Sequence, residues 1–88
     1  MAIYMVTYTD LFSGELNYST VSRYSVKAKS FLGAIRIMSK YLGLNFRLYL
    51  NNYFAKVYHS VSKSSAVIIE LFDDNESEEL ENYKALNY

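Results

Sequence analysis

The stretch from residue 30 to residue 43, SFLGAIRIMSKYLG, has the periodicity of an amphipathic helix and constrains what the rest of the chain can form. At 100° per residue, Arg36 and Lys40 fall on one side of this helix and the apolar residues on the other. The apolar stripe consists of Phe31, Ala34, Ile35, Met38, Tyr41 and Leu42. Ser30 is a suitable N-cap, and Gly43 can take the left-handed conformation that ends a helix. Because a helix this short is unstable alone, its stripe must pack against another element.

Segments with the composition and alternation of β-strands flank this helix and supply the surface that it needs. In chain order they span residues 2–9, 18–29, 46–50, 53–61 and 66–72. A hairpin loop is predicted over residues 10–17, and Asn51-Asn52 is typical of a tight turn. Tyr4 and Val6 of the first strand fall on one face, where the helix can cover them.

The predicted fold class is therefore α+β: a single, mostly antiparallel sheet in the order ββαβββ, with the amphipathic helix packed on one face. Residues 1–72 form the predicted domain, and residues 73–88 an acidic C-terminal segment that is a short helix or a tail. One helix leaves the second sheet face uncovered, which makes a homodimer with two sheets face to face a further expectation. The residues expected on that face are Ile3, Met5, Phe54 and Tyr58.

The formal net charge of zero hides a strong asymmetry along the chain. Residues 1–69 carry eight basic and two acidic side chains, whereas residues 70–88 carry seven acidic side chains and one basic. The acidic segment has three interpretations: a solvated tail, a segment that folds back on the basic body, or a surface that presents carboxylates to a basic partner. In the third interpretation the partner-binding residues are Asp73, Asp74, Glu76, Glu78, Glu79 and Glu81.

Basic residues of the second strand and the helix suggest an alternative function, a small nucleic-acid-binding regulator. The candidate contacts to nucleic acid are Arg23, Lys27, Lys29, Arg36 and Lys40. From residue 30 onward, the predicted order α-β-β-β-α also resembles the double-stranded-RNA-binding domain. That family needs a basic start to its last helix, where this chain has Asp73 and Asp74, so the resemblance fails at the residues that would grip phosphate.

The sequence contains no constellation that identifies a reaction, and we expect a protein that is not an enzyme and has no cofactor. Without cysteine, and with His59 as the only histidine, a metal site is not expected. Tyr58-His59-Ser60 is the one place where catalysis would be sought. No apolar run approaches the ~20 residues that span a bilayer, so we expect a cytoplasmic protein without membrane contact.

Two features of the chain are informative together. Within residues 18–44 a predicted strand leads through VKAKS into the helix sequence FLGAIRIMSKYLGL, and the whole chain is small, free of cysteine and rich in tyrosine. In these features the chain resembles the small α+β proteins of bacteriophages and other mobile elements, among them the anti-CRISPR proteins. The resemblance implies a non-catalytic, stoichiometric inhibitor of a host protein, including proteins that handle nucleic acids. It also implies a location in the cytoplasm of the host cell.

Overall fold

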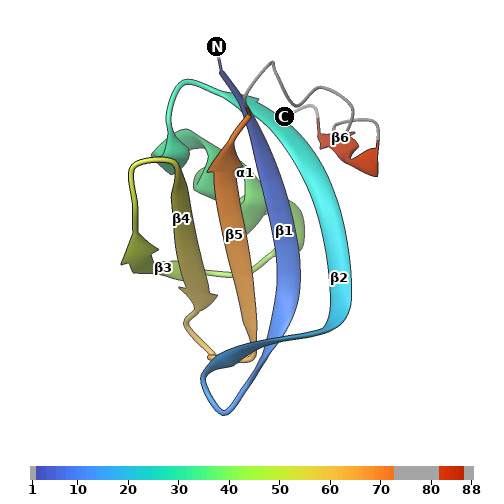
Figure 1. Cartoon of the computed structure of the whole chain (residues 1–88), viewed down its shortest axis with the longest axis vertical. Coiled ribbons are helices and arrows are strands. Elements are labelled where there is room, and N and C mark those ends of the chain that lie inside the picture. The colour runs from blue at the N-terminus through green and yellow to red at the C-terminus, as the bar shows by residue number, and fades with distance from the viewer. Residues whose placement is uncertain (1, 73–81, 87–88) are drawn as a thin grey trace.

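A computed structural model describes residues 2–72 and 82–86 of the chain (Figure 1). These residues form six β-strands and one α-helix. In chain order the elements are β1 (Ala2–Phe12), β2 (Glu15–Ala28), α1 (Phe31–Leu42), β3 (Phe46–Asn51), β4 (Ala55–Ser60), β5 (Ser65–Leu71) and β6 (Lys84–Leu86). The α+β class predicted from the sequence is confirmed.

All six strands lie in one sheet, in the order β3-β4-β5-β1-β2-β6 (Figure 1). Four of the pairings are antiparallel, and the pairing of β6 with β2 is parallel. The sheet is therefore mixed, and the described elements follow the order ββαββββ, with one strand more than predicted. Since β6 has only three residues, it is too short to show an alternating pattern in the sequence.

The predicted C-terminal helix or tail falls mostly on residues 73–81 and 87–88, which lie outside the described part of the chain. For residues 84–86 the prediction of a helix is wrong, because they form the edge strand β6. Leu86 pairs with Val26 of β2 and is only 7% exposed, so β6 contributes a side chain to the core.

The helix α1 confirms the predicted capping residues at both ends. Ser30 is extended, and its hydroxyl accepts a hydrogen bond from the Gly33 backbone N–H at 3.1 Å. Gly43 has φ +68°, and the Leu44 N–H donates to the Ser39 carbonyl at 3.1 Å. Both caps satisfy backbone groups that the end of a helix otherwise leaves unpaired.

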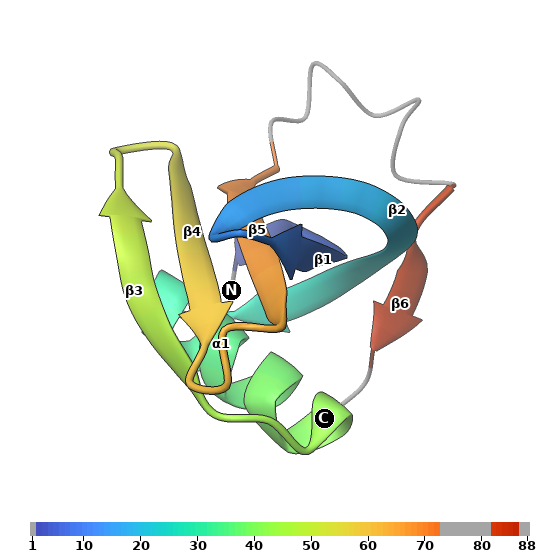
Figure 2. The same cartoon turned by 90° about the horizontal axis from the view of Figure 1, so that it is seen from below.

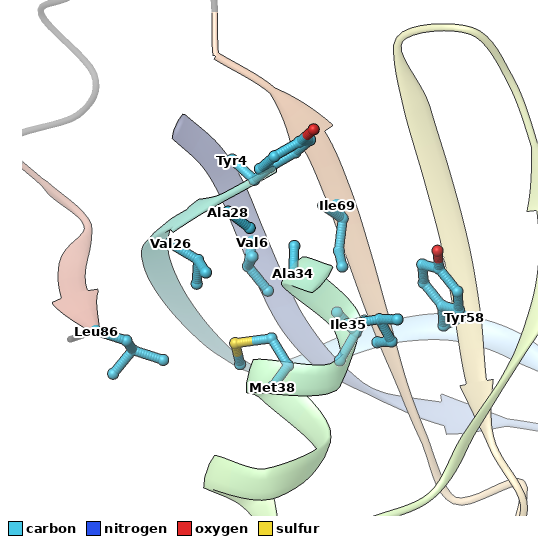
Figure 3. Packing of buried hydrophobic residues seen from close by; sticks show 11 residues of the cluster. Tyr4, Val6, Val26, Ala28, Ala34, Ile35, Met38, Tyr58, Ile69 and Leu86 are labelled. Atoms are coloured by element: carbon cyan, nitrogen blue, oxygen red, sulfur yellow. The ribbon is translucent and has the colours of Figure 1, made fainter. Parts of the chain in front are cut away.

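The core lies between α1 and one face of the sheet (Figure 3). Met38 of α1 is completely buried against this face, as are Val6 of β1 and Ile69 of β5. Val6 and Ile69 are neighbours across the β1–β5 pairing, so the strand register brings them under the same helix turn. The predicted shared face of Tyr4 and Val6 on β1 is confirmed.

Two other strand predictions require correction. The expected hairpin loop over residues 10–17 is instead a two-residue turn at Ser13 and Gly14, whose φ values are +54° and +81°. Positive φ at both positions is typical of a type I′ hairpin turn. Because this turn needs only two residues, β1 extends to Phe12 and β2 begins at Glu15. At the other hairpin, Tyr53 and Phe54 precede β4 and are exposed, because the strand begins only at Ala55.

The sheet face away from α1 does not hold all the residues expected there. Met5 does lie on it, but it is only 6% exposed. Tyr58 lies on the opposite face, where it belongs to the core beneath α1 (Figure 3). The prediction that Met5 and Tyr58 form an exposed apolar patch on this face is therefore wrong. The predicted homodimer stays a prediction, but these two residues cannot supply its interface.

We predict that Met38→Ala lowers the free energy of unfolding by about 2–5 kcal/mol, since it leaves a cavity in a well-packed core. Leu32→Ala is the matched control, because Leu32 lies on the same helix and is 55% exposed. Urea denaturation followed by circular dichroism measures both variants. Equal losses of stability in the two variants would contradict the assignment of Met38 to the core.

Candidate functional site

A bend in the long β1–β2 hairpin brings its tip over the sheet face away from α1. Thr9 pairs with Val21 and Leu11 with Leu16, so one residue of β1 opposes residues 17–20 of β2. Extra residues in one strand of a pair bend it and increase its twist. In Figure 2, α1 lies below the sheet and the bent hairpin arches above it.

The Asp10 carboxylate stabilises this bend through hydrogen bonds to residues of β2. It accepts hydrogen bonds from the Asn17 side-chain amide at 2.9 Å and from the Ser19 backbone N–H at 3.1 Å. The Ser19 hydroxyl donates to the same carboxylate. These hydrogen bonds, first that of the Ser19 side chain and then that of Asn17, hold the pKa of Asp10 far below its ordinary value. Asp10 is therefore ionised and structural, a role that the sequence pattern did not indicate.

The hairpin of β3 and β4 carries an exposed apolar surface. Five large side chains between residues 48 and 54 are 50–81% exposed. We call them the apolar hairpin surface: Leu48, Tyr49, Leu50, Tyr53 and Phe54. With about 200 Å² for each fully exposed side chain of this size, they expose roughly 600 Å². This area is spread over both faces of one hairpin, and an exposed apolar area of a few hundred Å² favours an interaction site.

A bulge in β3 turns one of these side chains onto the face away from α1. The register with β4 shifts between Leu48 and Leu50, which leaves Tyr49 as the additional residue. The Tyr49 ring stacks on His59 of β4, with 3.9 Å between the ring centroids and 11° between the planes. The stacked pair gives this part of the sheet a flat aromatic floor beside Arg47.

A pocket of about 600 Å³ lies between this floor and the tip of the β1–β2 hairpin. The hairpin tip contributes Leu11 and residues 13–15, and β3 contributes residues 47–49. Arg47 and Lys63 line the pocket with positive charge, and Glu15 is the acidic side chain among its lining residues. The size is within the range of binding pockets in proteins.

His59 lines this pocket beside Tyr49 and Arg47. Its pKa is lowered from the ordinary value of 6.5 because burial disfavours the charged imidazolium. Across residues 2–72 and 82–86, no carboxylate forms a hydrogen bond or ion pair with His59. Its sequence neighbours also point elsewhere: Tyr58 lies in the core, and the Ser60 hydroxyl accepts the Ser64 and Ser65 backbone N–H groups.

The basic residues predicted to bind nucleic acid do not form one surface. Arg23 and Lys27 alternate with the buried Val26 along β2 and therefore lie on the sheet face away from α1. Arg36 and Lys40 lie on the exposed side of α1, beyond the opposite face. Lys29 belongs to the connection between β2 and α1.

The acidic candidates Asp73, Asp74, Glu76, Glu78, Glu79 and Glu81 all lie outside the described residues. Within the described ranges, no group of His, Asp and Glu side chains has the arrangement of a metal site. In the same part of the chain, no helix has the length and apolar character needed to cross a bilayer.

Sequence reasoning missed the apolar hairpin surface because it located residues 46–50 in a strand without identifying which side would be covered. One signal was present. Large apolar residues occupy both alternating positions of LYLNNYF, whereas a strand with one buried face carries polar residues at every second position.

We predict that Asp10→Asn destabilises the protein at neutral pH. The side-chain NH₂ of asparagine donates hydrogen bonds, and it would replace a carboxylate oxygen that accepts them from residues of β2. The folded state depresses the Asp10 pKa, so its contribution to stability is present above about pH 3.8 and is lost as the pH falls below it. Urea denaturation at several pH values should show this acid-dependent loss in the wild type and a smaller loss in Asp10→Asn. Glu15→Gln is the control, since it removes a carboxylate from the same hairpin without these hydrogen bonds.

We predict that NMR titration of His59, the only histidine, gives a midpoint below 6.5. Tyr49→Ala should raise this midpoint toward 6.5, because it uncovers one face of the imidazole. Tyr53→Ala is the control, since Tyr53 contacts Phe54 in the turn. An unchanged midpoint in Tyr49→Ala would show that the stacked ring does not cause the shift.

Comparisons with protein-family models, with characterised proteins and with solved structures gave no match to this chain. The inference of its function therefore depends on the surface that the fold presents.

Proposed function

We propose that this chain is a non-catalytic protein-binding module whose contact surface is the apolar hairpin surface of β3 and β4. The exposure of five large apolar side chains on one short hairpin carries this proposal. Tyr and Phe supply large contact areas with few rotatable bonds, so they lose little entropy when a partner covers them.

The rest of the fold supports a rigid presentation of this surface. Tyr58 of β4 is buried beneath α1, and Val67 of β5 beside it is completely buried. The hairpin therefore extends from the core, and a partner can bind it without rearranging the sheet. The resemblance to phage-encoded inhibitors adds the expectation that binding blocks the activity of a host protein.

Nucleic acid is a weaker candidate than protein for this surface. Proteins that bind single strands combine aromatic side chains with a basic groove that follows the backbone. Here the aromatic residues of the β3–β4 hairpin have Arg47 and Lys63 beside them in the pocket, whereas the five predicted basic contacts lie elsewhere, on or after β2 and on the outer side of α1.

We predict that Leu48→Lys combined with Leu50→Lys abolishes stoichiometric capture of a protein partner from host-cell lysate. Both leucines are at least half exposed, so the folded state should tolerate the change, which circular dichroism verifies. Val21→Lys is the control for an added lysine, because it places one at an exposed apolar position of a different strand, β2.

Capture should persist at high salt, since apolar burial is not screened by ions. Mass spectrometry of the eluted complex gives the partner and its stoichiometry. Capture that survives the double substitution, but is lost in Arg36→Glu combined with Lys40→Glu, would assign binding to the helix instead.

A further inference from the structure

We infer that the partner binds as an extended segment added to the edge of β3, with an acidic side chain directed at Arg47 and Lys63 in the adjoining pocket. This inference rests on the proposed function and specifies the chemistry of the segment that is bound.

Leu48 and Leu50 lie on opposite faces of the sheet, which favours a partner strand beside β3 over a partner that covers one face of the sheet. Leu48 is paired with Tyr58 and lies on the α1 side of the sheet, whereas Leu50 is paired with Val57 and lies on the other side. A partner on either face covers only one of these leucines. A strand beside β3 carries its own side chains on both faces and covers both.

The outer edge of β3 is open to such a strand. In the described part of the chain, β3 pairs with β4 alone and forms the end of the sheet. Edge strands are usually protected by charged residues, proline, bulges or a covering element. Of these protections, β3 has one charged residue, Arg47, and the bulge at Tyr49, while four of its six residues are apolar and favour pairing.

The charge of the pocket specifies the added segment further. Arg47 pairs with His59 and therefore lies on the face that carries the pocket. The residue of an added strand opposite Arg47 lies on the same face, with about 5 Å between the two Cβ atoms. Because burial keeps His59 neutral near pH 7, the cations at this position are Arg47 and Lys63, against one carboxylate from Glu15.

These positions define a pattern for an antiparallel partner segment. The residue opposite Leu50 is apolar, the residue opposite Leu48 is apolar on the other face, and the residue opposite Arg47 is Asp or Glu. A second copy that pairs through its own β3 does not fit this pattern. The sequence of β3, FRLYLN, contains no acid, so two β3 strands paired about a two-fold axis leave both Arg47 side chains without a carboxylate.

The probe for this inference is a display library of random twelve-residue peptides, selected on three immobilised proteins in parallel. They are the wild type, Arg47→Glu combined with Lys63→Glu, and Arg36→Glu combined with Lys40→Glu. The last is a matched control with the same change in net charge on the far side of the molecule. Peptides selected on the wild type and on the control should share an acidic residue flanked by apolar residues.

Selection on Arg47→Glu combined with Lys63→Glu should favour a basic residue at the same position. A synthetic peptide from the wild-type selection should lose about ten-fold in affinity when its acid is changed to the amide, since a charge-assisted hydrogen bond is lost. Methylation of its alternate backbone nitrogens should abolish binding, because those groups pair with β3. NMR of the complex should show slower hydrogen exchange at β3 amides.

The outcomes separate this inference from the proposed function. Peptides that bind β3 without an acidic preference would overturn the inference and leave the proposed function intact. If no peptide depends on Leu48 and Leu50, but a folded partner protein still does, the added strand is wrong. If neither depends on them, the proposed function fails as well. A wild-type dimer in light scattering that Leu48→Lys dissociates would replace the partner segment with a second copy.

Discussion

One helix of twelve residues can cover only one face of a six-stranded sheet, and the arrangement of this protein follows from how the other face is protected. Here the protein bends its longest hairpin over that face. Asp10 stabilises the bend, because its carboxylate accepts hydrogen bonds from donors of the four β2 residues that oppose it. The tip of this hairpin faces residues 47–49 of β3 across the pocket, and the apolar side chains of the β3–β4 hairpin stay exposed to a partner.

The parts of the fold that local chemistry determines were predictable from the sequence. Ser30 and Gly43 mark the two ends of α1, and the alternation in β1 identifies the face that the helix covers. The position of the helix across the sheet follows from these two patterns, since each apolar face has to meet another. These elements also form the buried centre of the molecule.

Features that depend on contacts between distant residues were not predictable. The bend at Asp10 requires Asn17 and Ser19 to meet one carboxylate, and nothing in the local pattern distinguishes this aspartate from a turn residue. The exposure of Leu50 could not be predicted for a related reason. Alternation shows that a leucine belongs to a strand, but whether its neighbour in space is another strand or solvent depends on the order of the strands in the sheet. The acidic side chains between residues 73 and 81 lie outside the described residues, so their role stays a prediction.

The two edges of the sheet differ in a way that bears on assembly. At the β2 edge the chain adds its own strand β6, whose three residues offer a short template, whereas at the β3 edge six residues are available. Open-ended growth of a fibre from stacked sheets requires each molecule to offer two edges that complement each other. β6 covers residues 24–26 of β2 and has only three residues of its own, so the two end strands of the sheet do not complement each other in length. The fold thus favours a closed complex of defined size over a polymer, even though it exposes an apolar edge.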